Sequence, residues 1–374
     1  MKILKLVLGL ACLAILVSNV HTMSRWSETR GVYDDICYLR QAHLFQLYGT
    51  GGFDTDATRD EDHFLGRKLR EIGFPEGQVA PCHPPAKSGK YVLQYPPGTG
   101  FLLALFQEGH QVVPLYVACN LIVCGFALLS IFMARSPSEV LVAGAFGALA
   151  LYMMINPTKA SYSMAPTMVI CAASGYLTAW WLTRDRHEIL LVVLIGLLLG
   201  LSVNFRLPNL FLIAGYVLYL GIAFLHSRTG ATFLRGAAFS AAYIVGLTPT
   251  LIANAINAGS PFKTTYGSED ALAPEFNIEI LGRYLHDLQF GLILLAVGST
   301  VWLLRVGKAG ARHVALLVVG NLLINLVFFL SHPIFTPYYV VPVTMLSMWS
   351  VCFARLMQLP EVARLGRLGQ TISP

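Results

Sequence analysis

The chain has 374 residues, of which 55% are hydrophobic and 12% charged, and its formal net charge is +6. Soluble domains carry about 25% charged residues. This composition excludes a disordered chain, a soluble enzyme with a conventional charged surface, and a nucleic-acid binder with a basic face. It predicts an all-α polytopic membrane protein, for which no nucleic-acid partner is expected.

Apolar runs of membrane-spanning length recur along the chain. A bilayer-crossing helix needs about 20 apolar residues, and the first run occupies residues 1–20. It begins with Lys2 and Lys5, and no small-residue cleavage pattern follows it, so we expect an uncleaved first transmembrane helix. Later runs predict about nine more spans, at 112–134, 139–156, 164–183, 188–204, 208–225, 233–257, 288–304, 313–330 and 339–357.

The basic residues alternate between the junctions of these spans. One set of junctions carries Arg135, Arg184, Arg186, Arg228, Arg235, Arg305, Lys308, Arg312, Arg355, Arg364 and Arg367. The opposite set carries Lys159, Arg206, Lys263 and Arg283. Short cytoplasmic loops carry the excess of Lys and Arg, so the first set is expected inside the cell. Both termini are then cytoplasmic in a multi-pass protein of the inner membrane.

This topology divides the chain into regions. Residues 21–110 form a large outer loop with interfacial helices, which is the candidate catalytic region. Residues 111–357 form the remaining bundle, with short outer loops at 258–287 and 331–338. Residues 358–374 form a cytoplasmic tail. Any chemistry is therefore expected on the outer side of the membrane.

Two cysteines, Cys37 and Cys82, lie in the large outer loop, and the other five lie in predicted spans. An oxidising compartment would allow a disulfide between the two, and two free thiols are the alternative. The spacing of cysteines and histidines matches no metal-binding pattern, and no metal site is predicted.

The sequence from Asp34 predicts a helix on the membrane surface that ends near Gly49. Asp34 and Asp35 fall in its first turn, where the positive end of the helix dipole keeps carboxylates ionised. Tyr38 follows one turn later. The acidic pair is a candidate catalytic site, and a capped, solvated helix start is the alternative.

A rigid turn lies at the end of the large outer loop. The residues Gln94, Tyr95, Pro96 and Pro97 precede an apolar segment of about ten residues, which is too short to span a bilayer. We expect an interfacial helix here, with the turn either bordering a substrate cavity or serving as a connector.

Basic and aromatic residues mark the other outer segments. Arg206 lies at the outer end of a hairpin of two spans and could bind a phosphate, although a snorkelling Arg would look the same. Lys263 is expected to face the same cavity. The remaining candidates, which are also typical interfacial anchors, are Tyr266, His332 and Tyr338.

This layout resembles the GT-C fold glycosyltransferases that use polyprenyl-phosphate sugars, such as the protein O-mannosyltransferases and the enzymes that add aminoarabinose to lipid A. In motif, the resemblance covers a few short stretches. Asp34, Asp35, Tyr38 and Ala42 match the acidic pair of that family and its following Tyr and Ala. Pro96 and Pro97 match its Pro-Pro segment, and Arg206 matches the basic residue of its middle hairpin.

The resemblance implies a general base at Asp34, a supporting acid at Asp35, and donor-phosphate binding by Arg206 with Lys263. The implied partners are a polyprenyl-phosphate-linked sugar, membrane lipid, and an acceptor that is a glycan, a lipid or a protein. Some relatives carry an acid and a Lys before Pro-Pro, where this chain has Gln94 and Tyr95, so a divalent metal does not carry over.

Two other functions remain open on the sequence. A transporter or flippase of lipid-linked sugars would need charged residues along several spans, and the predicted spans hold almost no Asp or Glu. A non-catalytic assembly subunit of the membrane would need none of the candidate site residues.

Overall fold

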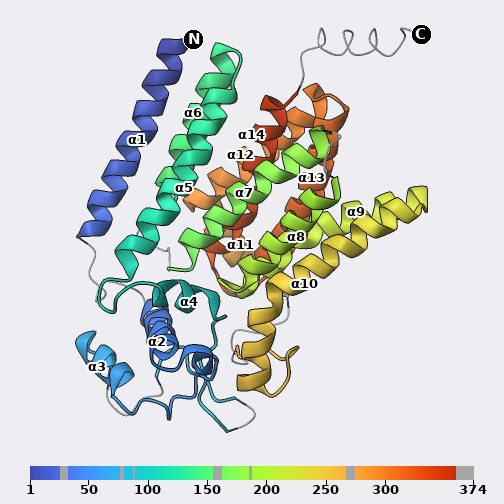
Figure 1. Cartoon of the computed structure of the whole chain (residues 1–374). Coiled ribbons are helices and arrows are strands. Elements are labelled where there is room, and N and C mark those ends of the chain that lie inside the picture. Colours follow the sequence, from blue (N-terminus) through green and yellow to red (C-terminus); the bar gives the residue numbers. More distant parts are fainter. Residues whose placement is uncertain are drawn as a thin grey trace, which may run out of the picture.

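The computed structural model describes residues 1–25, 33–75, 80–86, 89–154, 162–184, 188–266 and 274–358, without the side chains of residues 33, 34 and 337. The predicted Lys159, Arg186, Arg364 and Arg367 and most of the tail lie outside these residues. Within them the chain is helical and has no β-strand, only one isolated bridge between Pro85 and Tyr91. The prediction of an all-α protein is confirmed (Figure 1).

Each predicted apolar run forms a helix. The corresponding helices are α1 (Lys2–Ser24), α5 (Val112–Met133), α6 (Pro137–Tyr152), α7 (Met164–Thr183), α8 (Glu188–Val203), η3 with α9 (Leu207–Ile213 and Ala214–Ser227), α10 (Gly230–Ala258), α12 (Leu288–Val306), α13 (Ala309–Leu330) and α14 (Val340–Leu356). Among the described residues, six helices are long and apolar enough to cross a membrane: α1, α5, η3 with α9, α10, α12 and α13.

The shorter apolar helices are α6, α8 and α14, and α7 has 20 residues, 13 of them buried. Large apolar side chains are exposed along the outside of the bundle, for example Ile222 at 58% and Val245 at 63%. Surface of this kind is stable in lipid rather than in water. The chain is therefore a multi-pass membrane protein.

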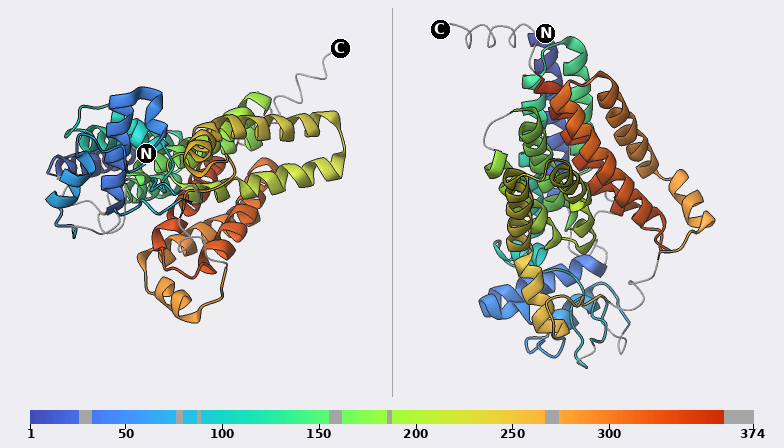
Figure 2. Two further views of the ribbon diagram at one scale, coloured as in Figure 1. Left: turned by 90° about the horizontal axis from the view of Figure 1, so that it is seen from below. Right: turned by 90° about the vertical axis from the view of Figure 1, so that its right-hand side faces the viewer.

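Close helix crossings in the bundle depend on glycine. A Cβ at Gly200 of α8 would lie 2.2 Å from the Tyr243 carbonyl of α10, and one at Gly246 would lie 2.4 Å from the Leu197 carbonyl. Small residues of this kind allow two backbones to approach inside a membrane. The pair α9 and α10 diverges from the pair α12 and α13 (Figure 2).

The basic junctions gather on the side of the bundle away from α2 and α4 (Figure 1). Glu139 at the start of α6 pairs with Arg355 at the end of α14 at 3.3 Å and accepts the Arg135 N–H at 2.9 Å. Glu188 at the start of α8 pairs with Arg235 near the start of α10. These contacts join the α5–α6 junction to the end of α14 and the start of α8 to the first part of α10. All of these junctions belong to the set that is predicted to be cytoplasmic.

The outer loop folds into a packed unit. It contains α2 (Tyr33–Tyr48), η2 (Gly49–Phe53), α3 (Phe64–Glu71) and α4 (Gly98–Ala104), while the later outer segments contain α11 (Ile278–Leu285) and η4 (Pro337–Tyr339). The structure corrects the predicted position of α2. Residues 35–45 are buried by protein on every face, because η2, α4 and the loop around residue 82 surround the helix.

A disulfide and a buried charge hold this unit together. Cys37 and Cys82 are bonded, with their Cα atoms 6.5 Å apart. Arg40, which is 1% exposed, donates hydrogen bonds to the Thr55 and Asp56 carbonyls at 2.8 Å and contacts His83 Nε2 at 2.9 Å. Burial and, to a smaller extent, the Arg40 charge lower the pKa of His83 to about 4. His83 is therefore neutral, with Nδ1–H donating to Pro81.

A second histidine ties α2 to its neighbours. His43 lies between the carboxylates of Asp62 at 2.7 Å and Glu108 at 2.9 Å, and its ring stacks on Phe64 at 4.1 Å. Burial raises the pKa of Asp62, but the hydrogen bond and charge of His43 outweigh it, so this pKa lies below its usual value. Asp62 therefore has a structural role in the outer unit.

Candidate active site

A cavity of ≈ 850 Å³ lies where α8, α10 and the end of α13 meet the outer unit. It brings together segments that are far apart in the sequence. Seven of the predicted site residues line it: Tyr38, Gln94, Tyr95, Arg206, Tyr266, His332 and Tyr338. These residues, which come from α2, the 94–95 segment and the later outer segments, therefore lie around one cavity.

Arg206 is the cationic group of this cavity among the described residues that line it. It follows α8, and its extended backbone leads into η3. Its side chain is 7% exposed, and Nη1 is buried with no hydrogen-bond partner. The guanidinium lies 4.8 Å from the ring centroid of Tyr338 and 5.6 Å from that of Tyr339. The faces of aromatic rings stabilise a cation only in part, so the Arg206 guanidinium has the capacity to bind an anion.

Asn204 fixes the backbone that carries Arg206. Its Nδ2 donates to the Gly246 carbonyl at 2.7 Å, and its Oδ1 accepts the Thr250 N–H at 2.9 Å. An uninterrupted helix would join those two groups directly, and Pro249 lies between them. The Asn204 amide thus bridges α10 where the helix changes direction (Figure 1).

The Pro-Pro turn holds the other side of Asn204. The N–H of Gly98, at the start of α4, donates to the Asn204 carbonyl at 2.7 Å. A Cβ at Gly98 would lie 2.7 Å from the Asn204 Cβ, so a larger residue would push the two segments apart. Pro96 and Pro97 are both buried and neither lines the large cavity, whereas Pro96 lines a narrower pocket that adjoins it. Their role is to place Gly98, and through it the Arg206 segment.

Aromatic rings form one wall of the cavity. The rings of Tyr38 and Tyr95 lie 5.1 Å apart, and those of Tyr95 and Tyr266 lie 6.0 Å apart. Gln94 Nε2 donates to the Tyr95 hydroxyl at 3.1 Å, and the Gln94 carbonyl accepts from Thr265 at 3.0 Å. These contacts fix rings from α2 and from the 94–95 segment against the loop that follows α10.

The acidic pair occupies the helix start that leads to this wall. Asp35 is 1% exposed, its Oδ1 accepts the Tyr162 N–H at 2.9 Å, and it does not line the cavity. Ser163, the next residue after Tyr162, does line it. Asp35 therefore positions the segment before α7. The side chain of Asp34 lies outside the described residues.

Lys263 does not join Arg206 in the cavity. Its side chain is exposed, whereas the flanking residues Phe262 and Thr264 line the cavity. The expectation that Lys263 faces the phosphate site is thus not met by the structure. Among the described residues, no group of three His, Cys, Asp or Glu side chains is placed to hold a metal ion.

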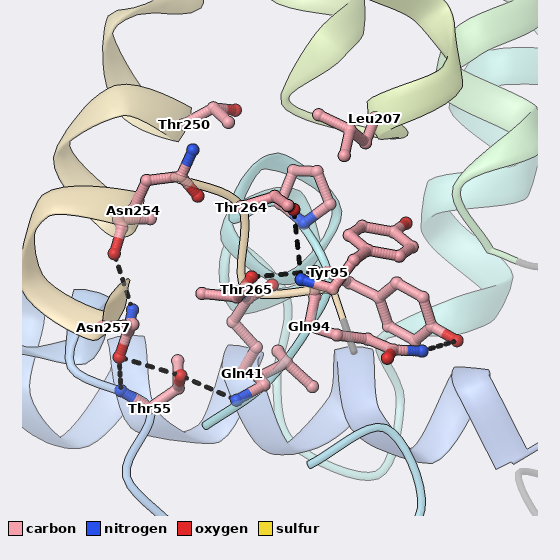
Figure 3. A pocket seen from close by; sticks show the side chains of 14 residues that line it. Gln41, Thr55, Gln94, Tyr95, Leu207, Thr250, Asn254, Asn257, Thr264 and Thr265 are labelled. Atoms are coloured by element: carbon pink, nitrogen blue, oxygen red, sulfur yellow. Dashed lines mark hydrogen bonds between the residues drawn. The ribbon is translucent and has the colours of Figure 1, made fainter. Parts of the chain in front are cut away.

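The sequence interpretation missed the polar side of the site. A narrow pocket of ≈ 10 Å³ adjoins the large cavity and shares Asn254, Thr250 and Thr264 with it (Figure 3). The sequence interpretation also missed Tyr339, although the ring of this residue contacts the Arg206 guanidinium. A signal for Asn254 does exist, because this amide and Asn257 follow Pro249 at the outer end of an apolar helix.

The chain matches no protein-family model, and the search of curated proteins returns no match. The functional conclusion therefore depends on the geometry of the cavity and on the residues that line it.

Proposed function

We propose that this protein is an integral-membrane glycosyltransferase. It would transfer a sugar from a polyprenyl-phosphate donor to an acceptor hydroxyl on the outer side of the inner membrane. The observation that carries the proposal is Arg206, a buried guanidinium with an unpartnered Nη1 in a cavity lined by aromatic and apolar groups. Such a charge fits a lipid phosphate, since guanidinium binds phosphate oxygens in a bidentate geometry.

The proposed reaction is a single displacement. The acceptor oxygen bonds to the anomeric carbon while the bond from that carbon to the phosphate oxygen breaks. The electron pair stays on the phosphate, which leaves as polyprenyl phosphate, and the hydroxyl proton passes to a carboxylate base. Arg206 stabilises the charge that develops on the leaving phosphate. No acid is needed to protonate the leaving group.

Asp34 is the proposed base. It lies four residues before Tyr38 on α2, which places the two positions on the same face of the helix, and Tyr38 lines the cavity. Asp35, on the neighbouring position, is engaged with the Tyr162 backbone and supports the geometry. This division gives the two acids different roles, as the resemblance implies.

Ten spans with both termini in the cytoplasm complete the proposal. The support is the basic junctions, since the turn between α5 and α6 and the end of α14, which Arg135 and Arg355 join through Glu139, lie at the end of the bundle away from the outer unit (Figure 1). Excess positive charge marks the cytoplasmic side. The disulfide between Cys37 and Cys82 also favours an oxidising compartment for the outer unit.

A lipid-sugar transporter is less well supported. Among the described residues, the buried polar groups within the helices of the bundle are uncharged, such as Asn19, which donates to Asn120 at 2.8 Å. Such pairs join helices to each other, and a polar translocation path would need charged or water-exposed groups along several spans.

The test is Asp34→Asn in purified membranes supplied with radiolabelled polyprenyl-phosphate sugar and a mixture of envelope acceptors. We expect transfer to fall at least about 100-fold, because general-base catalysis contributes roughly 10²–10⁴-fold. Glu71→Gln, a change at an exposed carboxylate of α3, serves as the matched control. Near-normal transfer by Asp34→Asn would remove Asp34 as the base, and no transfer by the wild type from any such donor would refute the function.

A further inference from the structure

The polarity of the cavity changes along one face of α10. Leu247, Leu251 and Asn254 follow each other at helical spacing, and all three line the cavity. The seven residues from Leu247 to Asn254 correspond to about 10 Å along the helix axis. Over this distance the wall passes from aliphatic side chains to an amide.

The apolar end of the cavity lies beside η3 and the end of α13. Phe211 and Phe328 both line it, and their rings stack with centroids 3.9 Å apart. Leu210, the neighbour of Phe211, lines the cavity and is 40% exposed. This end therefore reaches the outer surface of the bundle, where a lipid tail can enter.

Arg206 lies between this apolar end and the polar end. It immediately precedes η3, and Phe211 follows five residues later on the same 3₁₀ segment, about 10 Å away. Leu207, the residue after Arg206, lines both the large cavity and the narrow pocket. The segment that carries Arg206 therefore borders both ends of the cavity.

The polar end is built from uncharged hydrogen-bonding groups. The narrow pocket is lined by amide and hydroxyl side chains of α2, α10 and the 264–266 segment, and none of the described residues that line it is charged (Figure 3). Gln41 is 1% exposed, and its Oε1 is buried with no hydrogen-bond partner. Buried polar groups normally find partners, and a pocket of this size has room for one water-sized group, so it is suited to a single hydroxyl of a sugar that lies in the adjoining cavity.

Resting on the proposed function, we infer that this polar end binds the transferred sugar and that the sugar is uncharged, with Asn254 and Gln94 as recognition residues. The order of apolar wall, guanidinium and amide-lined pocket matches the order of prenyl tail, phosphate and sugar. None of the described residues that line the narrow pocket is charged, so an amino group placed in that pocket would be buried without a carboxylate partner. A uronic acid would compete with the phosphate for Arg206.

The experiment measures binding of polyprenyl phosphate and of its glucosyl form to the full-length protein in nanodiscs. We expect the glucosyl group to increase affinity at least about tenfold in the wild type. Asn254→Leu, which keeps the branch at Cγ but has no hydrogen-bonding group, should lose that increase while binding polyprenyl phosphate with a Kd within twofold of the wild type. Gln107→Leu, at an exposed amide outside the cavity, is the control and should keep the increase.

Specificity provides a second, independent readout. The wild type should bind and use a glucosyl donor at least about 100-fold better than a donor carrying a 4-amino sugar, because an unpaired buried cation is strongly disfavoured. Asn254→Asp should reduce this preference at least about tenfold. Equal use of both donors by the wild type, or an unchanged sugar increment in Asn254→Leu, would overturn the inference.

The same data separate the two proposals. Arg206→Gln should weaken binding of polyprenyl phosphate itself, with or without sugar. If that binding does not depend on Arg206, the proposed function fails. If it does and the sugar adds nothing through Asn254, only the sugar site is refuted. Thermal unfolding of each variant verifies folding, and Thr264→Val provides a second change in the same pocket.

Discussion

Two buried arginines in two regions of the molecule show how differently the same side chain can be used. Arg40, in the outer unit, uses both terminal nitrogens to donate to backbone carbonyls and to contact His83, and only its Nε is buried without a partner. Arg206, at the end of the bundle, has a buried Nη1 without a partner and is flanked by tyrosine rings. The hydrogen bonds of Arg40 stabilise the fold, whereas Nη1 of Arg206 remains available to a ligand. A buried charge indicates function only when its hydrogen-bonding capacity is unused.

The largest expected effect comes from removing the structural arginine. Arg40→Met should lower the free energy of unfolding by about 4 kcal/mol, because it leaves the Thr55 and Asp56 carbonyls buried without donors. Thermal unfolding and protease resistance of the outer unit measure this loss. Arg70→Met, at an exposed arginine of α3, is the control and should change little. A similar loss in both variants would contradict the structural role.

The functional arginine should give the opposite pattern. Arg206→Gln is expected to lower kcat/KM about 100-fold, equivalent to about 2.7 kcal/mol of transition-state stabilisation, with no loss of thermal stability. Arg206→Lys should recover part of the activity, since an ammonium keeps the charge but not the bidentate geometry. Kinetic assays with the lipid-linked donor, together with unfolding curves, test both statements. A variant that is unstable and equally active would show that Arg206 serves the fold.

A smaller effect is expected from pH, and only in the outer unit. The pKa of His83 is about 4 in the folded protein, against an ordinary value of 6.5, so the unfolded chain binds more protons between these values. Stability should therefore fall as pH decreases, by about 2 kcal/mol between pH 7.5 and pH 5.

His83→Gln sharpens this test because its amide can still accept from Arg40 and donate to Pro81 without titrating. The variant should lose less stability than the wild type over the same pH range. The measurement is the thermal midpoint of purified protein at both pH values. An equal loss in the two proteins would mean that other groups cause the acid sensitivity.

The sequence alone determined the class of the protein and the position of its helices. Apolar runs at helical length predicted the segments that form α5 to α10 and α12 to α14, and the run at 164–183 coincides with α7 (Met164–Thr183). This success has a local cause, since lipid demands a continuous apolar stretch whose backbone is satisfied within the helix itself. The outer aromatic residues were also predicted to share a site, and most of them line one cavity.

Only the tertiary structure decided which polar groups are used by the fold and which remain for a ligand. The burial of α2 depends on contacts with η2, α4 and the disulfide partner Cys82. The hydropathy pattern of α2 itself does not indicate these contacts. The placement of Arg206 depends on Asn204 reaching α10 at Pro249 and on Gly98 approaching from the Pro-Pro turn. Lys263 and Asn254 differ in the same way, because Lys263 is exposed and does not line the cavity, whereas Asn254 does. The hydropathy of a segment depends only on its own consecutive residues. The hydrogen-bond partners of a buried polar group, in contrast, are residues that only folding brings together.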